Sequence, residues 1–161
     1  MIIGQRTTLN DVEQRLVKTV AVLRNKENRM KGFVDRKKSD EESITIDVFG
    51  FGGELAFCRI HNVYPDLYIK ARKTSDDRGD VSWSGLGLDV KSTKMDGGSL
   101  LVLPWKKSRY VDGCALMTGE FPTYEYRGMI RTEEVFQDQW LRDLGRGDTY
   151  VVPQTQLKET I

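Results

Sequence analysis

The chain has 161 residues, two cysteines, a single histidine and a formal net charge of +1 at pH 7. This length is typical of one domain and is enough to bury a core without disulfides or a structural metal. The charged and apolar fractions are those of a globular protein, and no apolar stretch is long enough for a membrane helix. The near-zero net charge argues against a protein that coats nucleic acid through bulk charge alone, so any such contact must come from local basic patches.

The N-terminal segment 8–30 has the pattern of an amphipathic helix. Its apolar residues recur at steps of three and four, as one helix face requires: Leu9, Val12, Leu16, Val20 and Leu23. Asn10 and Glu13 have the spacing of a capping pair, and Gly32 follows a basic C-terminal end. These signals predict a first helix with defined ends.

Two cysteines and the N-terminal residues bear on the cellular compartment. Cys58 and Cys114 each lie in an apolar run, which predicts buried thiols in a reducing environment. Neither belongs to a CxxC pair, so no zinc site is expected. Residues 1–6 become polar too soon for a signal peptide. We therefore expect a cytoplasmic location.

The segment from 36 to 60 predicts a change from extended chain to helix. Residues 36–43 are nearly all polar, and 44–48 then alternate apolar and polar side chains, which predicts a strand or extended arm. The glycines within 50–53 interrupt this pattern, and the helix formers of 54–60 predict a second helix that begins at them. Glu54 is thereby expected in the first turn of this helix.

Beyond residue 62 the apolar segments are short and are often separated by Gly or Pro, as in a largely antiparallel sheet. Strands are expected at 67–69, 81–84, 86–92, 100–103, 111–117, 124–130 and 150–153, with a short helix at 132–136. This order predicts an α/β or α+β fold with a single mixed β-sheet flanked by helices. It also predicts one domain over 1–161, with an N-terminal helix and arm (1–43) and a core (44–161).

Two carboxylates and an ammonium lie close together in the sequence, at Asp80, Asp89 and Lys91. Residues i and i+2 of a strand project to the same face, so Asp89 and Lys91 would point together while Val90 enters the core. Two carboxylates about 4 Å apart repel by roughly 4 kcal/mol at an effective dielectric near 20, so a fold seldom brings such a pair together without a cation. Oxygen ligands favour Mg²⁺ or Mn²⁺, and this set could hold the ion against a phosphodiester.

These residues resemble the PD-(D/E)XK nuclease superfamily, the fold of many restriction endonucleases and Holliday-junction resolvases. The resemblance covers about residues 50–117. It rests on Glu54 on a helix, Asp80 at a strand start, and the tripeptide from Asp89 to Lys91 on the next strand. Gly79 stands where the family name has proline. The segment after Lys91 is predicted as loop and strand, where the family usually has a helix.

The resemblance implies a restriction endonuclease-like core and a Mg²⁺-dependent (or Mn²⁺-dependent) deoxyribonuclease. Asp80 and Asp89 would hold the metal, Glu54 would add a ligand directly or through water, and Lys91 would orient a water or stabilise charge on the phosphate. DNA is the expected partner, and cutting both strands of a duplex favours a homodimer. Such a compact chain fits a phage or mobile-element protein that acts in the host cytoplasm.

Basic residues flank this constellation on both sides, and Trp83, Trp105 and Tyr110 are interleaved with them. Such a mixture suits phosphate contacts and base stacking. The candidates for DNA contact are Lys70, Arg72, Lys73, Lys94, Lys106, Lys107 and Arg109. A charged, solvated surface is the structural alternative for each of them.

Other functional motifs are weaker. The glycines of 50–53 lack the full GxGxxG pattern, and the single histidine, His61, excludes HExxH zinc sites and nucleases that need a histidine pair. We expect His61 at a helix end. The alternative to an enzyme is a catalytically inactive nucleic-acid-binding or assembly module on a nuclease-like scaffold, and RNA stays open as a substrate.

Overall fold

The computed structural model of the chain describes residues 1–32, 40–69, 79–108 and 111–161. The elements in chain order are β1 (Arg6–Thr8), α1 (Asp11–Met30), α2 (Asp40–His61), β2 (Val81–Trp83), β3 (Leu86–Thr93), β4 (Leu100–Val102), the 3-10 helix η1 (Pro104–Ser108), β5 (Gly113–Glu120), β6 (Thr123–Arg131), α3 (Thr132–Val135), η2 (Asp138–Trp140), β7 (Leu141–Asp143), β8 (Asp148–Val152) and η3 (Gln154–Gln156). This mixture of helices and strands confirms the predicted α/β or α+β class. No helix in the described ranges is long and apolar enough to cross a membrane.

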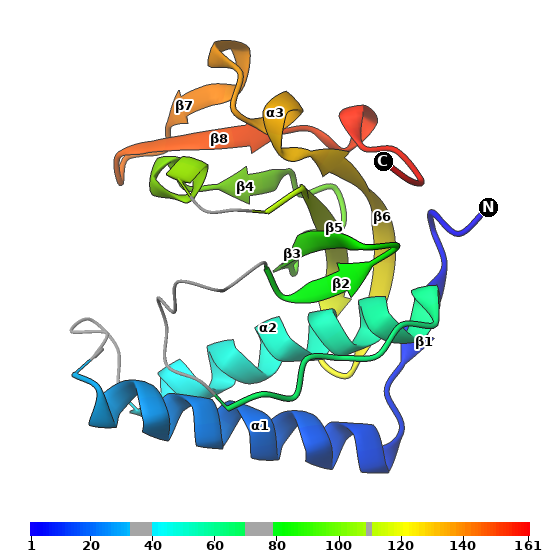
Figure 1. Cartoon of the computed structure of the whole chain (residues 1–161), viewed down its shortest axis with the longest axis vertical. Coiled ribbons are helices and arrows are strands. Elements are labelled where there is room, and N and C mark those ends of the chain that lie inside the picture. The colour runs from blue at the N-terminus through cyan, green and yellow to red at the C-terminus, as the bar shows by residue number, and fades with distance from the viewer. Residues whose placement is uncertain (33–39, 70–78, 109–110) are drawn as a thin grey trace.

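The strands form two sheets that lie as separate layers (Figure 1). The larger sheet has the order β1-β6-β5-β3-β2, and it is mixed because β3 and β5 run parallel while its other neighbours run antiparallel. The smaller sheet has the antiparallel order β4-β8-β7. The prediction of a single sheet is therefore wrong. The physical reason is that β4 and β8 pair with each other and pack their buried side chains over one face of the larger sheet, instead of extending its edge.

Both faces of the larger sheet are covered, as the alternation along β5 illustrates. Ala115 and Met117 belong to the core shared with α1 and α2, whereas Cys114 and Leu116 belong to the core under the smaller sheet. This is the period of two that a strand imposes on its side chains. Cys58 and Cys114 are buried free thiols, as predicted, and burial raises the pKa of each to about 12.

The predicted N-terminal helix is confirmed as α1, including its cap. The Asn10 side chain accepts a hydrogen bond from the backbone N–H of Glu13, and the Glu13 carboxylate accepts one from the backbone N–H of Asn10. Gly32 follows the helix with a φ of +79°, a conformation that glycine adopts without steric cost. Arg59 of α2 lies 2.7 Å from Glu13 and ties the two helices together.

One continuous helix, α2, runs through the segment predicted as strand, glycine break and new helix. The strand at 44–48 and the helix start at the glycines are therefore wrong predictions. The glycines lie inside the helix because it crosses the sheet closely: a Cβ on Gly52 would overlap the Tyr124 side chain, and one on Gly53 would overlap Ser92. Packing against the sheet thus outweighs the local β preference of alternating β-branched residues.

Most of the other predicted elements are present. The expected strands at 81–84, 86–92, 100–103, 111–117, 124–130 and 150–153 correspond to β2, β3, β4, β5, β6 and β8, and the short helix at 132–136 is α3. Residues 67–69 form no strand in the described structure. The pattern does not predict β1 and β7, because each has three mainly polar residues and too little alternation to detect. His61 ends α2 as expected.

Candidate functional site

Asp89 and Lys91 lie on β3 and share the face opposite to Val90, as their spacing predicts. Lys91 Nζ is 3.3 Å from Asp89 Oδ2. Lys106, from η1, places its Nζ 2.9 Å from the same oxygen. The Asp89 side chain is 2% exposed, so one buried carboxylate is in contact with two ammonium groups.

Asp80 lies directly before β2, where the pairing of β2 with β3 ends. Its backbone N–H donates to the Leu88 carbonyl at 2.8 Å, and its Oδ2 accepts a hydrogen bond from the Val90 N–H at 2.8 Å. The side chain therefore occupies the edge of β3 that a longer β2 would have covered. Gly79 has a φ of +101°, which the ring of proline forbids, so this backbone explains why proline is absent there.

Glu54 lies well inside α2 and not in the first turn, which corrects the expected position. Its side chain is 16% exposed. The absence of a side chain at Gly53 lets this part of α2 approach Ser92 of β3.

Electrostatic interactions connect these three carboxylates. Burial raises the pKa of Glu54 well above its ordinary value, Asp80 raises it further, and Arg24 lowers it. Burial also raises the pKa of Asp80, which Lys91 lowers and Asp89 raises. Asp80 is thus the middle member of a chain of interacting acids: it interacts with Glu54 on one side and with Asp89 and Lys91 on the other.

The two lysines differ in how firmly they hold their charge. Burial disfavours the charged form of Lys91, but the carboxylates of Asp80 and Asp89 outweigh it and raise the pKa of this lysine. For Lys106, burial and the neighbouring Lys91 outweigh the attraction of Asp89, so its pKa is lowered. Lys106 is therefore the more easily deprotonated of the two lysines.

Two side chains that border the cluster are not indicated by the sequence. Arg24 of α1 places Nη1 3.7 Å from Glu54 Oε2. Ser92 Oγ is buried without a hydrogen-bond partner among the described residues. Arg24 carries no local signal, because it is one of several basic residues near the end of α1 and meets Glu54 through tertiary packing alone.

The donors at this site are of the type that Mg²⁺ and Mn²⁺ prefer, namely carboxylate oxygens. Among the described residues, however, no three His, Cys, Asp or Glu side chains form a ready-made metal-binding group. Asp89 Oδ2 instead faces two ammonium groups. A divalent cation at Asp89 Oδ2 would therefore have to compete with Lys91 and Lys106 for this oxygen.

The predicted DNA-contacting residues fall into three groups. Lys94 and Lys107 are exposed, and Lys94 Nζ lies 5.8 Å from the centroid of the Phe49 ring. Lys106 is mostly buried on Asp89 and belongs to the cluster. Lys70, Arg72, Lys73 and Arg109 lie outside the described residues.

Comparison with curated proteins gives no match, and comparison with solved structures gives none either. One family model does match, over residues 1–119, a range that contains Glu54, Asp80, Asp89, Lys91 and Lys106. The match thus covers both long helices and the whole cluster. The chain belongs to this family, which is described as a family of unknown function, DUF5843.

Proposed function

We propose that the chain is a metal-dependent DNA endonuclease that hydrolyses phosphodiester bonds. One observation carries the proposal. Glu54 from α2, Asp80 from the start of β2, and Asp89 and Lys91 from β3 form one mostly buried charged cluster, in which Asp80 raises the pKa of Glu54 and Asp89 raises the pKa of Asp80. A divalent cation stabilises such a group of carboxylates, and divalent cations also catalyse phosphodiester hydrolysis.

Each residue then has a distinct role. Asp80 and Asp89 would hold Mg²⁺ or Mn²⁺, and Glu54 would add a ligand directly or through water. The ion, when bound, would supply a Lewis acid for the scissile phosphate and lower the pKa of a water ligand. Lys91, which Asp80 and Asp89 keep charged, stabilises the negative charge that develops on the phosphate. Its 3.3 Å contact with Asp89 fixes its direction.

DNA is the proposed substrate, and basic residues that flank the cluster in the sequence contact its phosphates. The exposed Lys94 and Lys107 belong to this set, together with Lys70, Arg72, Lys73 and Arg109. Two copies of the chain related by a two-fold axis would cut both strands of a duplex, so we include a homodimer in the proposal. The proposed place of action is the cytoplasm.

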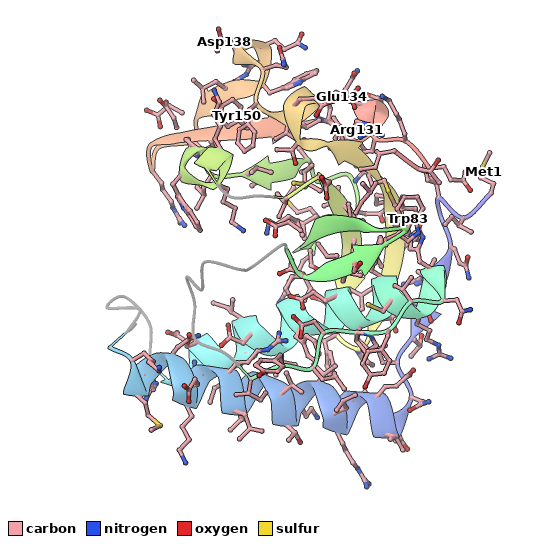
Figure 2. All side chains as sticks on the ribbon, viewed as in Figure 1. Met1, Trp83, Arg131, Glu134, Asp138 and Tyr150 are labelled. Atoms are coloured by element: carbon pink, nitrogen blue, oxygen red, sulfur yellow. The ribbon has the colours of Figure 1, made fainter. Side chains whose placement is uncertain are left out.

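The test is cleavage of supercoiled plasmid and of flapped or four-way DNA in Mg²⁺. Asp80→Asn and Lys91→Ala should abolish cleavage, because they remove a metal ligand and the phosphate-facing charge. The matched controls are Asp138→Asn and Lys158→Ala. Asp138 is exposed and lies beside the smaller sheet, at the top of the view (Figure 2). Both controls should cleave like the wild type.

Melting curves in EDTA separate loss of chemistry from loss of fold in these variants. If the wild type cleaves none of these DNAs in Mg²⁺ or Mn²⁺, or if Asp80→Asn cleaves as well as the wild type, the proposal is wrong.

The second candidate is a catalytically inactive nucleic-acid-binding or assembly module. The observation that favours it is the contact of Asp89 Oδ2 with two ammonium groups, which neutralises the acid without a metal. Titration with Mn²⁺ distinguishes the two functions. Binding at millimolar ion that disappears in Asp89→Ala supports the nuclease, and absence of binding supports the module.

A further inference from the structure

A hollow of about 660 Å³ opens beside Asp80. Residues 64–68 form one wall, and the other wall consists of Asp80, Val81 and Ser82 together with Gly85 and Gly87 of the β2–β3 hairpin. This volume lies within the range of about 300–1000 Å³ in which proteins bind small ligands. The hollow therefore has room for a single nucleotide.

The wall 64–68 is irregular chain whose backbone is held by specific contacts. Arg24 donates to the carbonyl of Asp66 at 2.6 Å and to the carbonyl of Tyr68 at 3.2 Å. Asp66 Oδ1 in turn accepts a hydrogen bond from the Tyr68 N–H at 2.9 Å. The guanidinium of Arg24 also lies over the Phe51 ring, 4.7 Å from its centroid. One half-buried cation of α1 thus anchors this wall to the helix layer.

Two tyrosine rings stand exposed on this anchored backbone. Tyr64 is 81% exposed and Tyr68 is 72% exposed, and both line the hollow. Exposed aromatic rings on a fixed backbone are surfaces on which bases stack, and stacking tolerates every base because each has a π-face. The chemistry of this wall is therefore suited to a nucleobase.

The position of the hollow relates it to the candidate site. Asp80 is both a wall residue of the hollow and the middle member of the acidic cluster. A phosphate held near Asp80 would carry its adjoining sugar and base directly to the hollow. A base inside a duplex is paired and stacked, and bringing it into a pocket costs free energy that an unpaired base does not require.

We propose that this hollow is a subsite for one unpaired nucleotide next to the scissile phosphate, with Tyr68 and Tyr64 as its stacking surfaces. The inference rests on the proposed nuclease function and names its substrate class: DNA with unpaired nucleotides, such as single strands, flaps and branch points. Continuous duplex is then the poorer substrate.

The first test measures binding without cleavage. A fluorescent ten-residue thymidine oligonucleotide is compared with a ten-unit abasic sugar-phosphate chain of equal charge, by anisotropy, in EDTA and again in Ca²⁺. The wild type should bind the thymidine oligonucleotide about 5- to 100-fold more tightly in at least one condition. Tyr68→Ala should lose most of this preference, and Tyr68→Phe should keep it. Equal binding of the two chains by the wild type in both conditions overturns the inference.

The second test measures cleavage rates of single-stranded and duplex DNA of one sequence in Mg²⁺. The wild type should cleave the single strand faster, and Tyr68→Ala should reduce this ratio. If the wild type cleaves single-stranded and duplex DNA at equal rates, and Tyr68→Ala has the same ratio of the two rates, the subsite is contradicted but the proposed nuclease function is not. If the wild type cleaves no DNA at all, the proposed nuclease function is contradicted. The anisotropy measurement still decides whether the hollow prefers a nucleobase.

Discussion

Replacement of Lys106 by methionine should tighten the binding of Mn²⁺ or Mg²⁺ while it weakens the fold in the absence of metal. Lys106 Nζ is 2.9 Å from Asp89 Oδ2, an oxygen that the proposed metal ion needs. The ammonium and the ion therefore compete for one buried carboxylate. Methionine keeps much of the aliphatic volume of the lysine stem and removes the charge.

The magnitude follows from this geometry. Opposite unit charges 2.9 Å apart attract by about 6 kcal/mol at an effective dielectric near 20, and desolvation of both groups cancels much of this. A hydrogen bond to a charged group retains a net value of about 1.5–3 kcal/mol. Removing the competitor should therefore lower the metal Kd by roughly 10- to 100-fold.

The loss of stability should be smaller than the full cost of breaking a buried ion pair. Lys91 still neutralises Asp89 from 3.3 Å in the variant, so the carboxylate is not left without a counter-charge. We expect the free energy of unfolding in EDTA to fall by about 1–2 kcal/mol, below the 3–5 kcal/mol typical of an abandoned buried charge.

Calorimetric titration with Mn²⁺ and melting curves with and without the ion measure both effects. Lys107→Met is the matched control, because Lys107 is the exposed neighbour of Lys106 in η1, and it should leave the metal Kd unchanged. An unchanged Kd in Lys106→Met, or the same change in both variants, would refute the competition for Asp89.

Three further predictions concern stability. Burial and a neighbouring carboxylate raise the pKa of Glu54 above 4.5, so ionisation of this residue lowers the stability of the fold as pH rises. In EDTA at neutral pH, Glu54→Gln should therefore raise the melting temperature, by about 2–4 °C for each kcal/mol of stability regained. A lower melting temperature in this variant would contradict the reasoning. Gly52→Ala should lower the free energy of unfolding by about 1–3 kcal/mol, because the added Cβ overlaps Tyr124. Gly50→Ala should raise it by about 0.5–1 kcal/mol, because a Cβ there meets nothing within 4 Å. Urea unfolding of both variants measures the difference, and equal effects would disprove the close approach of α2 to the sheet. Burial lowers the pKa of His61 from 6.5 to about 4, so as pH falls the unfolded chain binds this proton before the folded chain does. Between pH 6.5 and pH 4 the free energy of unfolding should therefore drop by up to about 1.4 kcal/mol per pH unit, and by less where water screens the ring. In His61→Phe the free energy of unfolding should fall less steeply with pH, as urea unfolding at several pH values would measure.

Much of the fold could be predicted because its signals are local. The capping pair Asn10 and Glu13 and the apolar spacing of α1 act within a few residues, and so does the alternation that places Asp89 and Lys91 on one face of β3. Burial of both faces of the larger sheet follows from continuous apolar runs such as that of β5.

Other features were decided by contacts between segments far apart in the chain. In the sequence the glycines of α2 look like a helix break, yet Gly52 lies in the middle of the helix. The reason is that the Tyr124 side chain of β6 occupies the space that a side chain at position 52 would fill. The separation of β4 and β8 into a second sheet depends in the same way on the face that they cover. Propensity is a weak preference that packing outweighs.

For the candidate site, the sequence by itself determined the residue types and the shared face of Asp89 and Lys91. Tertiary structure alone decided which groups surround them: Lys106 on Asp89, and Arg24 beside Glu54. The physical reason is that a charge interacts with whatever the fold brings within a few ångströms, whatever its distance along the chain. The sequence therefore named the acids and the lysine, and the packing of α1, α2 and η1 around β3 determined their electrostatic environment.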